Sequence, residues 1–292
     1  MGKIKLEGAI ELHCHYGPDF IQRDHTFQHA VTAMQAATEA AEAGMAAIVL
    51  KSHDFPTAAL AYTINQAVAG VRTFGGITLD HQVGGLNPFA VEHALRLGAK
   101  IVWLPTVASH QDYINGLGPR LGYPAPGIRT TGDDGNLLPV VREILDLVAE
   151  HDAVIATGHI TADEHFAVAR AFARRGRVIV THAGEPLAGP HLDRAQCVEL
   201  AGLGAYIEIT AQLCIAHMGA AARTPAEVGS LIDAIGPEQC VLGTDYGWST
   251  ELPHPAQGMR DFIDSLWEAG LSEAKLRTMA CDNSARLLRL AG

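Results

Sequence analysis

Eight short apolar runs recur along this chain, and longer amphipathic or alanine-rich stretches separate them. This alternation is typical of parallel β-strands joined by helical crossovers. The expected strands are Ala9–His15, Ala46–Lys51, Thr73–Leu79, Lys100–Leu104, Ala153–Thr157, Arg177–His182, Ala205–Ile209 and Cys240–Thr244. Eight such strands predict an α/β fold of the closed (β/α)8 TIM-barrel type, and 292 residues is an ordinary length for one such domain.

Glycines and capping residues set the bounds of the intervening helices. The expected helices are Phe27–Ala43, Pro88–Leu97, Thr161–Arg175 and Asp193–Leu203. A glycine follows each of them and precedes the next strand by a residue or two, as the short connections of a barrel require.

One segment after the fourth strand interrupts the alternation of strands and helices. Residues 105–136 are rich in glycine, proline and aspartate, which form turns. Loops longer than about 15 residues often act as lids or binding loops. We therefore expect a single domain over residues 1–292, with the 105–136 insertion as a lid or substrate loop. An exposed surface excursion or an oligomer contact is the alternative.

Composition narrows the class of partner. The formal net charge of -11 argues against nonspecific binding to nucleic acid or anionic membranes, so a small-molecule substrate is expected. The first residues are too short and interrupted for a signal peptide, and no apolar run approaches a membrane span, which favours a cytoplasmic protein. The five cysteines are scattered and predict neither disulfides nor a thiolate zinc site. Acidic barrels of this size are often homo-oligomers.

The first strand ends in a pair of histidines, His13 and His15. Residues i and i+2 of a strand share a face, so the two imidazoles should lie close enough to bind one cation. Taken alone the pair is a weak signal, because two histidines can equally line a solvated strand end.

Three further polar residues follow other strands. His159 follows the fifth strand, His182 ends the sixth and Asp245 follows the eighth. In a parallel barrel all carboxyl ends open on one face, so these side chains should converge with the first pair. The alternative is that His159 and His182 cap their strands through hydrogen bonds.

This ordered set resembles that of the amidohydrolase superfamily over nearly the whole chain, and residues 279–288 are similar to the asparagine-bearing helix that closes such barrels. The resemblance implies that His13, His15 and Asp245 bind one divalent metal. His159 would either join them or bind a second metal with His182. Imidazole and carboxylate ligands suit Zn²⁺, and also Mn²⁺ or Fe²⁺. One or two ions are therefore expected.

The fourth strand departs from the family pattern, because residues 101–106 contain neither the lysine nor the glutamate that often bridges two metals. Lys51, which ends the second strand, lies on the same predicted face. Desolvation would lower the pKa of its ammonium. Three roles stay open: a carbamate that bridges two metals, a contact to a substrate anion, and a structural ion pair.

Other polar residues fall where they could reach a substrate. They are His53, His81, His110, Arg129 and Glu208. For the histidines a supporting role behind the ligands is the default, and Arg129, like Arg120, would by default face solvent. Glu208 lies in an apolar strand and should face the barrel mouth or a basic partner.

These parts predict a metal-dependent hydrolase. A divalent cation lowers the pKa of bound water to near 7. Asp245 would act as general base, and Lys51 or His182 would polarise the scissile group. An amide, lactam, lactone or ester would be cleaved. The alternatives are a nonoxidative decarboxylase on a similar barrel and a noncatalytic metal-binding barrel.

Overall fold

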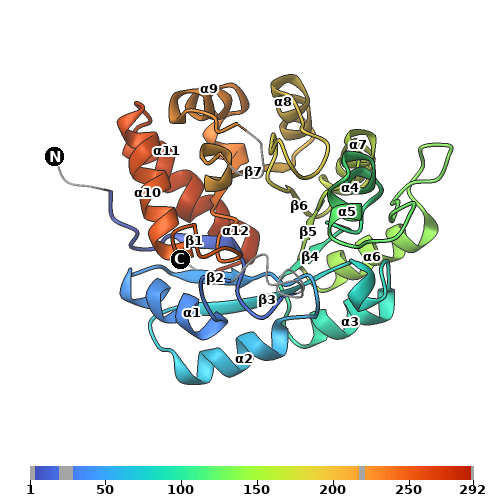
Figure 1. Ribbon diagram of the computed structural model, residues 1–292, viewed down its shortest axis with the longest axis horizontal. Coiled ribbons are helices and arrows are strands. Elements are labelled where there is room, and N and C mark those ends of the chain that lie inside the picture. The colour runs from blue at the N-terminus through green and yellow to red at the C-terminus, as the bar shows by residue number, and fades with distance from the viewer. Residues whose placement is uncertain (1–3, 20–28, 217–220, 291–292) are drawn as a thin grey trace. The chain divides into compact units, whose positions relative to one another are not determined.

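All eight expected strands are present in the computed structural model, which describes residues 4–19, 29–216 and 221–290. Their observed ends differ from the expected ends by no more than two residues. The strands form one sheet in the order β1 to β8 (Figure 1). The fold is a (β/α)8 TIM barrel, which confirms the fold class predicted from the sequence.

The chain divides into two compact units, and the first comprises residues 1–51, 59–75 and 208–292. Its complete strands are β1 (Ile10–Cys14), β2 (Ala47–Leu50) and β8 (Cys240–Gly243). Its helices are α1 (Ala33–Glu42), most of α2 (Ala58–Ala67), α9 (Pro225–Ile235), α10 (Pro255–Glu268), α11 (Glu273–Arg277) and α12 (Asn283–Leu288), with short turns η3 (Ala211–Cys214), η4 (Pro237–Gln239) and η5 (Thr278–Asp282). Helix α10 packs against α1 and β1.

The second unit comprises residues 52–58 and 76–207. Its complete strands are β4 (Ile101–Trp103), β5 (Val154–Ala156) and β6 (Arg177–Val180). Its helices are α3 (Pro88–Arg96), α4 (His110–Asn115), α5 (Leu117–Arg120), α6 (Pro139–Glu150), α7 (Ala162–Phe172) and α8 (Arg194–Gly202), with the turn η2 (His81–Val83). Strands β3 (Arg72–Thr78) and β7 (Tyr206–Thr210) each contribute residues to both units.

Local sequence signals explain where the helices begin. Four helices begin with the same pair of hydrogen bonds. The side chain of the capping residue accepts from the backbone N–H three residues later, and the side chain of the glutamate or glutamine there accepts from the backbone N–H of the capping residue. The capping residues are Thr32, Thr161, Asp193 and Thr224. These reciprocal bonds satisfy backbone donors that a helix start leaves unpaired. The expected start at Phe27 lies outside the described residues, and α1 begins at Ala33.

Strand β1 carries an irregularity next to its histidines. Glu11 pairs with Ile48 of β2 whereas Cys14 pairs with Leu50, so β1 advances three residues while β2 advances two. An extra residue of this kind is a β-bulge, which bends a strand and re-aims its side chains. The bulge lies within the segment that carries His13.

The insertion after β4 contains the two short helices α4 and α5 besides the turns expected there. Its role as a lid or substrate loop stays a prediction. Ser109 caps α4 by accepting a hydrogen bond from Asp112 N. Within the described residues, no helix combines the length and the apolar character needed to cross a membrane.

Glu164 ties the end of the insertion to α7. Its carboxylate accepts hydrogen bonds from the backbone of Thr130 at 2.6 Å, Thr131 at 3.1 Å and Thr161 at 2.9 Å. Burial opposes the charged form, but the backbone donors of Thr161 and Thr130 outweigh it and lower the pKa of Glu164.

We expect Glu164→Gln to lower the free energy of unfolding by about 1 to 3 kcal/mol at pH 7, because buried donors lose a charged acceptor. Since the pKa is depressed in the folded state, this stabilisation is complete above the unfolded value of 4.5 and is lost as the pH falls further. Urea unfolding at pH 7 and pH 4 measures both effects. Glu227→Gln is the matched control, because Glu227 caps α9 in the same way but is exposed. An equal loss in both variants would refute the role of the insertion contacts.

Candidate metal centre

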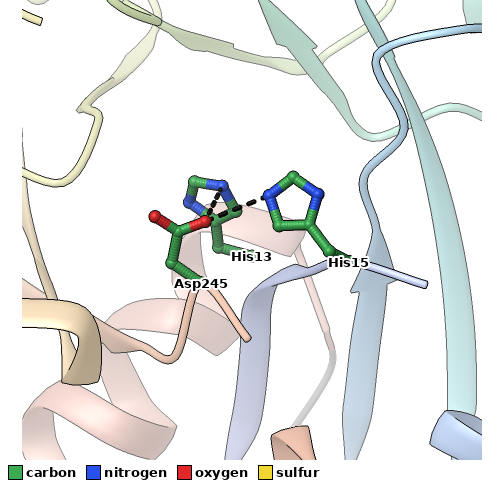
Figure 2. Close-up of side chains that lie close together, drawn as sticks. All are labelled: His13, His15 and Asp245. Atoms are coloured by element: carbon green, nitrogen blue, oxygen red, sulfur yellow. Dashed lines mark hydrogen bonds and ion pairs between the residues drawn. The ribbon is translucent and has the colours of Figure 1, made fainter. Parts of the chain in front are cut away.

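His13, His15 and Asp245 meet in the first unit (Figure 2). Asp245 Oδ1 lies 3.1 Å from His13 Nε2 and 3.0 Å from His15 Nε2. Both imidazoles are buried. The two histidines therefore lie close together, as expected, with ring centroids 5.3 Å apart. The loop after β8 adds a carboxylate oxygen to the two ring nitrogens.

The backbone fixes Asp245 beside β1. Asp245 N donates to His13 O at 3.1 Å, and His15 N donates to Tyr246 O at 2.9 Å. Asp245 itself has a φ of 62°, a left-handed conformation that costs energy in a residue other than glycine and that clusters at functional sites. Gly247 allows the close approach, because a Cβ there would lie 1.9 Å from His15 O.

Glu208 contacts the ring nitrogen of His13 that does not contact Asp245. Its Oε2 lies 3.1 Å from His13 Nδ1, and the glutamate is only 2% exposed. A carboxylate only accepts, so Nδ1 carries a proton, and Nε2 is the ring nitrogen that faces Asp245. Metal-binding histidines usually have such a partner on the other ring nitrogen. The basic partner expected for Glu208 is thus His13, and a contact of Glu208 to substrate stays a prediction.

Glu11 is a functional residue that the sequence reasoning missed. Its carboxylate accepts hydrogen bonds from His13 N at 2.8 Å and from Thr244 N at 3.0 Å. Glu11 therefore links the backbone at His13 to the backbone at Thr244, the residue before Asp245. Burial raises its pKa to about 7, against the lowering effect of the bonds from Thr244 and His13. A glutamate two residues before His13 in an otherwise apolar strand was the available signal.

The three ligand candidates are strongly coupled. Burial opposes protonation of His13, but Asp245 and then Glu208 outweigh it and raise the pKa of His13 to about 9. Burial lowers the pKa of His15 well below its usual value. Burial would also raise the pKa of Asp245, but His13 and His15 hold it well below its usual range. Asp245 is therefore an ionised carboxylate.

Lys51 contributes positive charge to this unit. It is buried at the end of β2, and its backbone N donates to Cys14 O at 2.9 Å. Its ammonium disfavours protonation of both His13 and His15. The bridging and substrate-binding roles of Lys51 stay predictions.

His159 and His182 meet in the second unit. Their Nε2 atoms lie 2.8 Å apart, and His159 Nδ1 lies 2.5 Å from Asp112 Oδ2. Asp112 is buried on α4 of the insertion and also accepts from Gly189 N at 2.8 Å. It orients His159 as Glu208 orients His13, and the sequence reasoning missed it. His182 has a φ of 26°, again left-handed.

His53, also in the second unit, has a similar partner. Its Nδ1 lies 3.1 Å from Asp80 Oδ2 and 2.9 Å from Thr106 Oγ1. Asp80 is buried, which raises its pKa, and it accepts from the backbone of Thr106 at 2.8 Å and Ala108 at 3.2 Å. A carboxylate thus fixes the His53 ring, and its predicted contact to substrate stays a prediction.

His110 and Arg129 pair with each other in the insertion. Pro126 O lies 2.6 Å from His110 Nδ1, and the Arg129 guanidinium lies 2.6 Å from His110 Nε2. A carbonyl only accepts and a guanidinium only donates, so His110 Nδ1 donates to Pro126 O and His110 Nε2 accepts from Arg129. His81 is exposed, and its ring stacks on Tyr123 with centroids 6.1 Å apart. Substrate contacts by these three residues stay predictions.

The chain matches a family described as a family of unknown function, DUF6282, over residues 8–208. No curated protein matches it.

Solved structures share its fold at low identity. An amidohydrolase from Pseudomonas aeruginosa is 14% identical, with a TM-score of 0.59 over 97% of this chain and 96% of that one. A 2,6-dihydroxybenzoate decarboxylase from Rhizobium is 13% identical, with a TM-score of 0.58 over 98% and 100%. The metallopeptidase dipeptidase AC is 15% identical, with a TM-score of 0.57 over 98% of both chains. These neighbours are amidohydrolase-superfamily TIM barrels, which confirms the resemblance at the level of fold.

Proposed function

We propose that this chain, which belongs to the DUF6282 family, is a metal-dependent hydrolase that cleaves an amide, lactam, lactone or ester bond of a small molecule. One observation carries the proposal: His13, His15 and Asp245 meet at about hydrogen-bond distance, and the buried Glu208 fixes the ring of His13. The hydrolases among the structural neighbours support it by analogy of fold.

The donor set fits a divalent cation. Two imidazole nitrogens and one carboxylate oxygen make three protein ligands, and three-ligand sites with an open position are typical of catalytic Zn²⁺. The same ligands suit Mn²⁺ and Fe²⁺. When bound, the cation would make hydroxide available near neutral pH and polarise the scissile group.

Asp245 is suited to move the proton. The neighbouring His13 and His15 hold its pKa well below the usual range, so the carboxylate is ionised. An ionised carboxylate beside the cation would be placed to accept a proton from the attacking water. It would then return the proton to the leaving group. Glu208 holds a proton on His13 Nδ1 and so leaves Nε2 for the cation. Glu11 accepts from the backbone of His13 and of Thr244, and so holds the residue before Asp245 beside His13.

His159 and His182 remain proposed metal ligands on the grounds of sequence. The Asp112 contact supports this role for His159, because an oriented imidazole with a lone pair on Nε2 is what a metal ligand requires. Lys51 remains the proposed bridging or substrate-binding group, and His182 a proposed polarising group. Whether one or two ions bind follows from direct metal analysis.

A nonoxidative decarboxylase is the second candidate, and one of the structural neighbours has that name. It would need the same ligands but no attack by water. Release of carbon dioxide from an aromatic carboxylic acid, without a hydrolysed product, would favour it over the hydrolase.

Metal removal tests the proposal. We expect the purified protein to contain close to one or two equivalents of Zn²⁺, Mn²⁺ or Fe²⁺ by mass spectrometry. Turnover on a panel of esters, lactones, lactams and amides should vanish after dialysis against a chelator and return with added metal. Tightly held metal without turnover on any compound, hydrolytic or decarboxylating, would instead support a noncatalytic barrel.

A further inference from the structure

Two polar side chains at the end of β7 are buried without hydrogen bonds. Neither the nitrogen nor the oxygen of the Gln212 carboxamide has a partner among residues 4–19, 29–216 and 221–290, and the same holds for Thr210 Oγ1. Gln212 is 2% exposed and Thr210 is fully buried. Thr210 ends β7, and Gln212 lies in the turn η3 that follows directly.

Such groups are costly to a fold. Buried polar atoms are hydrogen-bonded in the large majority of cases, and an orphaned carboxamide loses the water bonds it has in the unfolded chain. An apolar side chain of the same shape would be more stable at residue 212. Stability of the protein therefore does not account for the glutamine, whereas a ligand that supplies the missing partners would.

Both residues follow Glu208 at the end of β7. Glu208 and Thr210 are two residues apart in β7 and so share a face, and Glu208 contacts His13. Gln212 lies just past the carboxyl end of β7, and active sites of TIM barrels are built at the carboxyl ends of the strands.

We infer that Gln212 and Thr210 bind a polar group of the substrate, and that this group both donates and accepts hydrogen bonds, as an amide or a hydroxyl group does. The inference rests on the proposed function and adds a substrate class to the same site. A carboxamide offers an N–H₂ donor and a carbonyl acceptor, and a hydroxyl offers both roles. A carboxylate only accepts, and would leave the Gln212 oxygen without a partner.

Binding of two small probes to the zinc-loaded protein tests the inference without any turnover. Acetohydroxamate donates and accepts hydrogen bonds, whereas acetate only accepts. By calorimetry, we expect Gln212→Met to weaken acetohydroxamate about 10-fold, the equivalent of one hydrogen bond in a dry site, and to leave acetate unchanged. Equal affinity of both proteins for acetohydroxamate would overturn the inference, and so would an equal loss for both probes.

Thermal unfolding of the same variant gives an independent reading. Removal of an orphaned carboxamide should raise the Tm of the zinc-loaded protein by about 2 to 4 °C. A lower Tm would show that Gln212 has a structural partner, and would overturn the inference. Gln239→Met is the matched control, because Gln239 Oε1 is also buried and unpartnered but precedes β8 instead of following a strand, so this variant should bind both probes as the wild type does. If the wild-type protein takes up no zinc at all, the proposed function fails first, and that result is distinct from either outcome for Gln212.

Discussion

Asp245→Asn is expected to fold normally and to lose turnover by about 1,000-fold, the usual contribution of a general base in hydrolysis. Asparagine keeps an oxygen at the same place but cannot accept the proton of an attacking water. The expected loss is in kcat, because the proton moves in the transition state and not on substrate binding. Initial rates on the best compound of the panel, with metal content measured in parallel, give the result.

The control for this variant is Asp261→Asn on the exposed face of α10, where the carboxylate accepts a hydrogen bond from Gln257 Nε2 at 2.7 Å. It should retain full turnover. If Asp245→Asn binds metal as the wild type does and turns over substrate at the same rate, Asp245 is not the general base.

His13→Ala is expected to weaken metal binding by at least about 100-fold, because it removes a ligand, whereas Glu208→Gln removes only the partner that orients this ligand and should cost about 10- to 100-fold. Glutamine can still accept a hydrogen bond from Nδ1, but without the charge that strengthens it. Competition with a coloured chelator measures both affinities, and circular dichroism checks that each variant is folded.

A matched histidine distinguishes this effect from a general loss of imidazole. His254, in the same unit, contacts Glu39 at 2.8 Å on a half-exposed surface and lies outside the ligand set. His254→Ala should bind metal as the wild type does. Equal affinities in His13→Ala and His254→Ala would remove His13 from the metal centre.

The strands and the proximity of His13 and His15 could be predicted because both follow from local pattern. Apolar runs of five to seven residues between helical stretches predict strands whatever their partners are. The i and i+2 spacing of His13 and His15 predicts that their rings lie close together. They do, with centroids 5.3 Å apart, although β1 is bulged here and ends at Cys14. The position of Asp245 follows in the same way from the end of β8, although its left-handed backbone does not.

The carboxylates behind the histidines could not be predicted in the same way. Glu11 acts through backbone groups of two strands at opposite ends of the sequence, and Asp112 lies on a helix of 6 residues in a turn-rich segment. A helix this short shows no usable periodicity in its sequence. Ser109 can be recognised as its N-cap only once the helix itself is known. Glu208 stood out as an acidic residue in an apolar strand, but its partner depends on how β7 and β1 are placed in the folded unit.

Crystallographic anomalous scattering at the metal absorption edge would show directly where a metal binds. We expect a peak within coordination distance of His13 Nε2, His15 Nε2 and Asp245, with Glu208 still bonded to His13 Nδ1. The same map would show the number of ions and whether Lys51 is carboxylated. A metal-loaded crystal whose anomalous peaks all lie away from these three side chains would contradict the proposed centre.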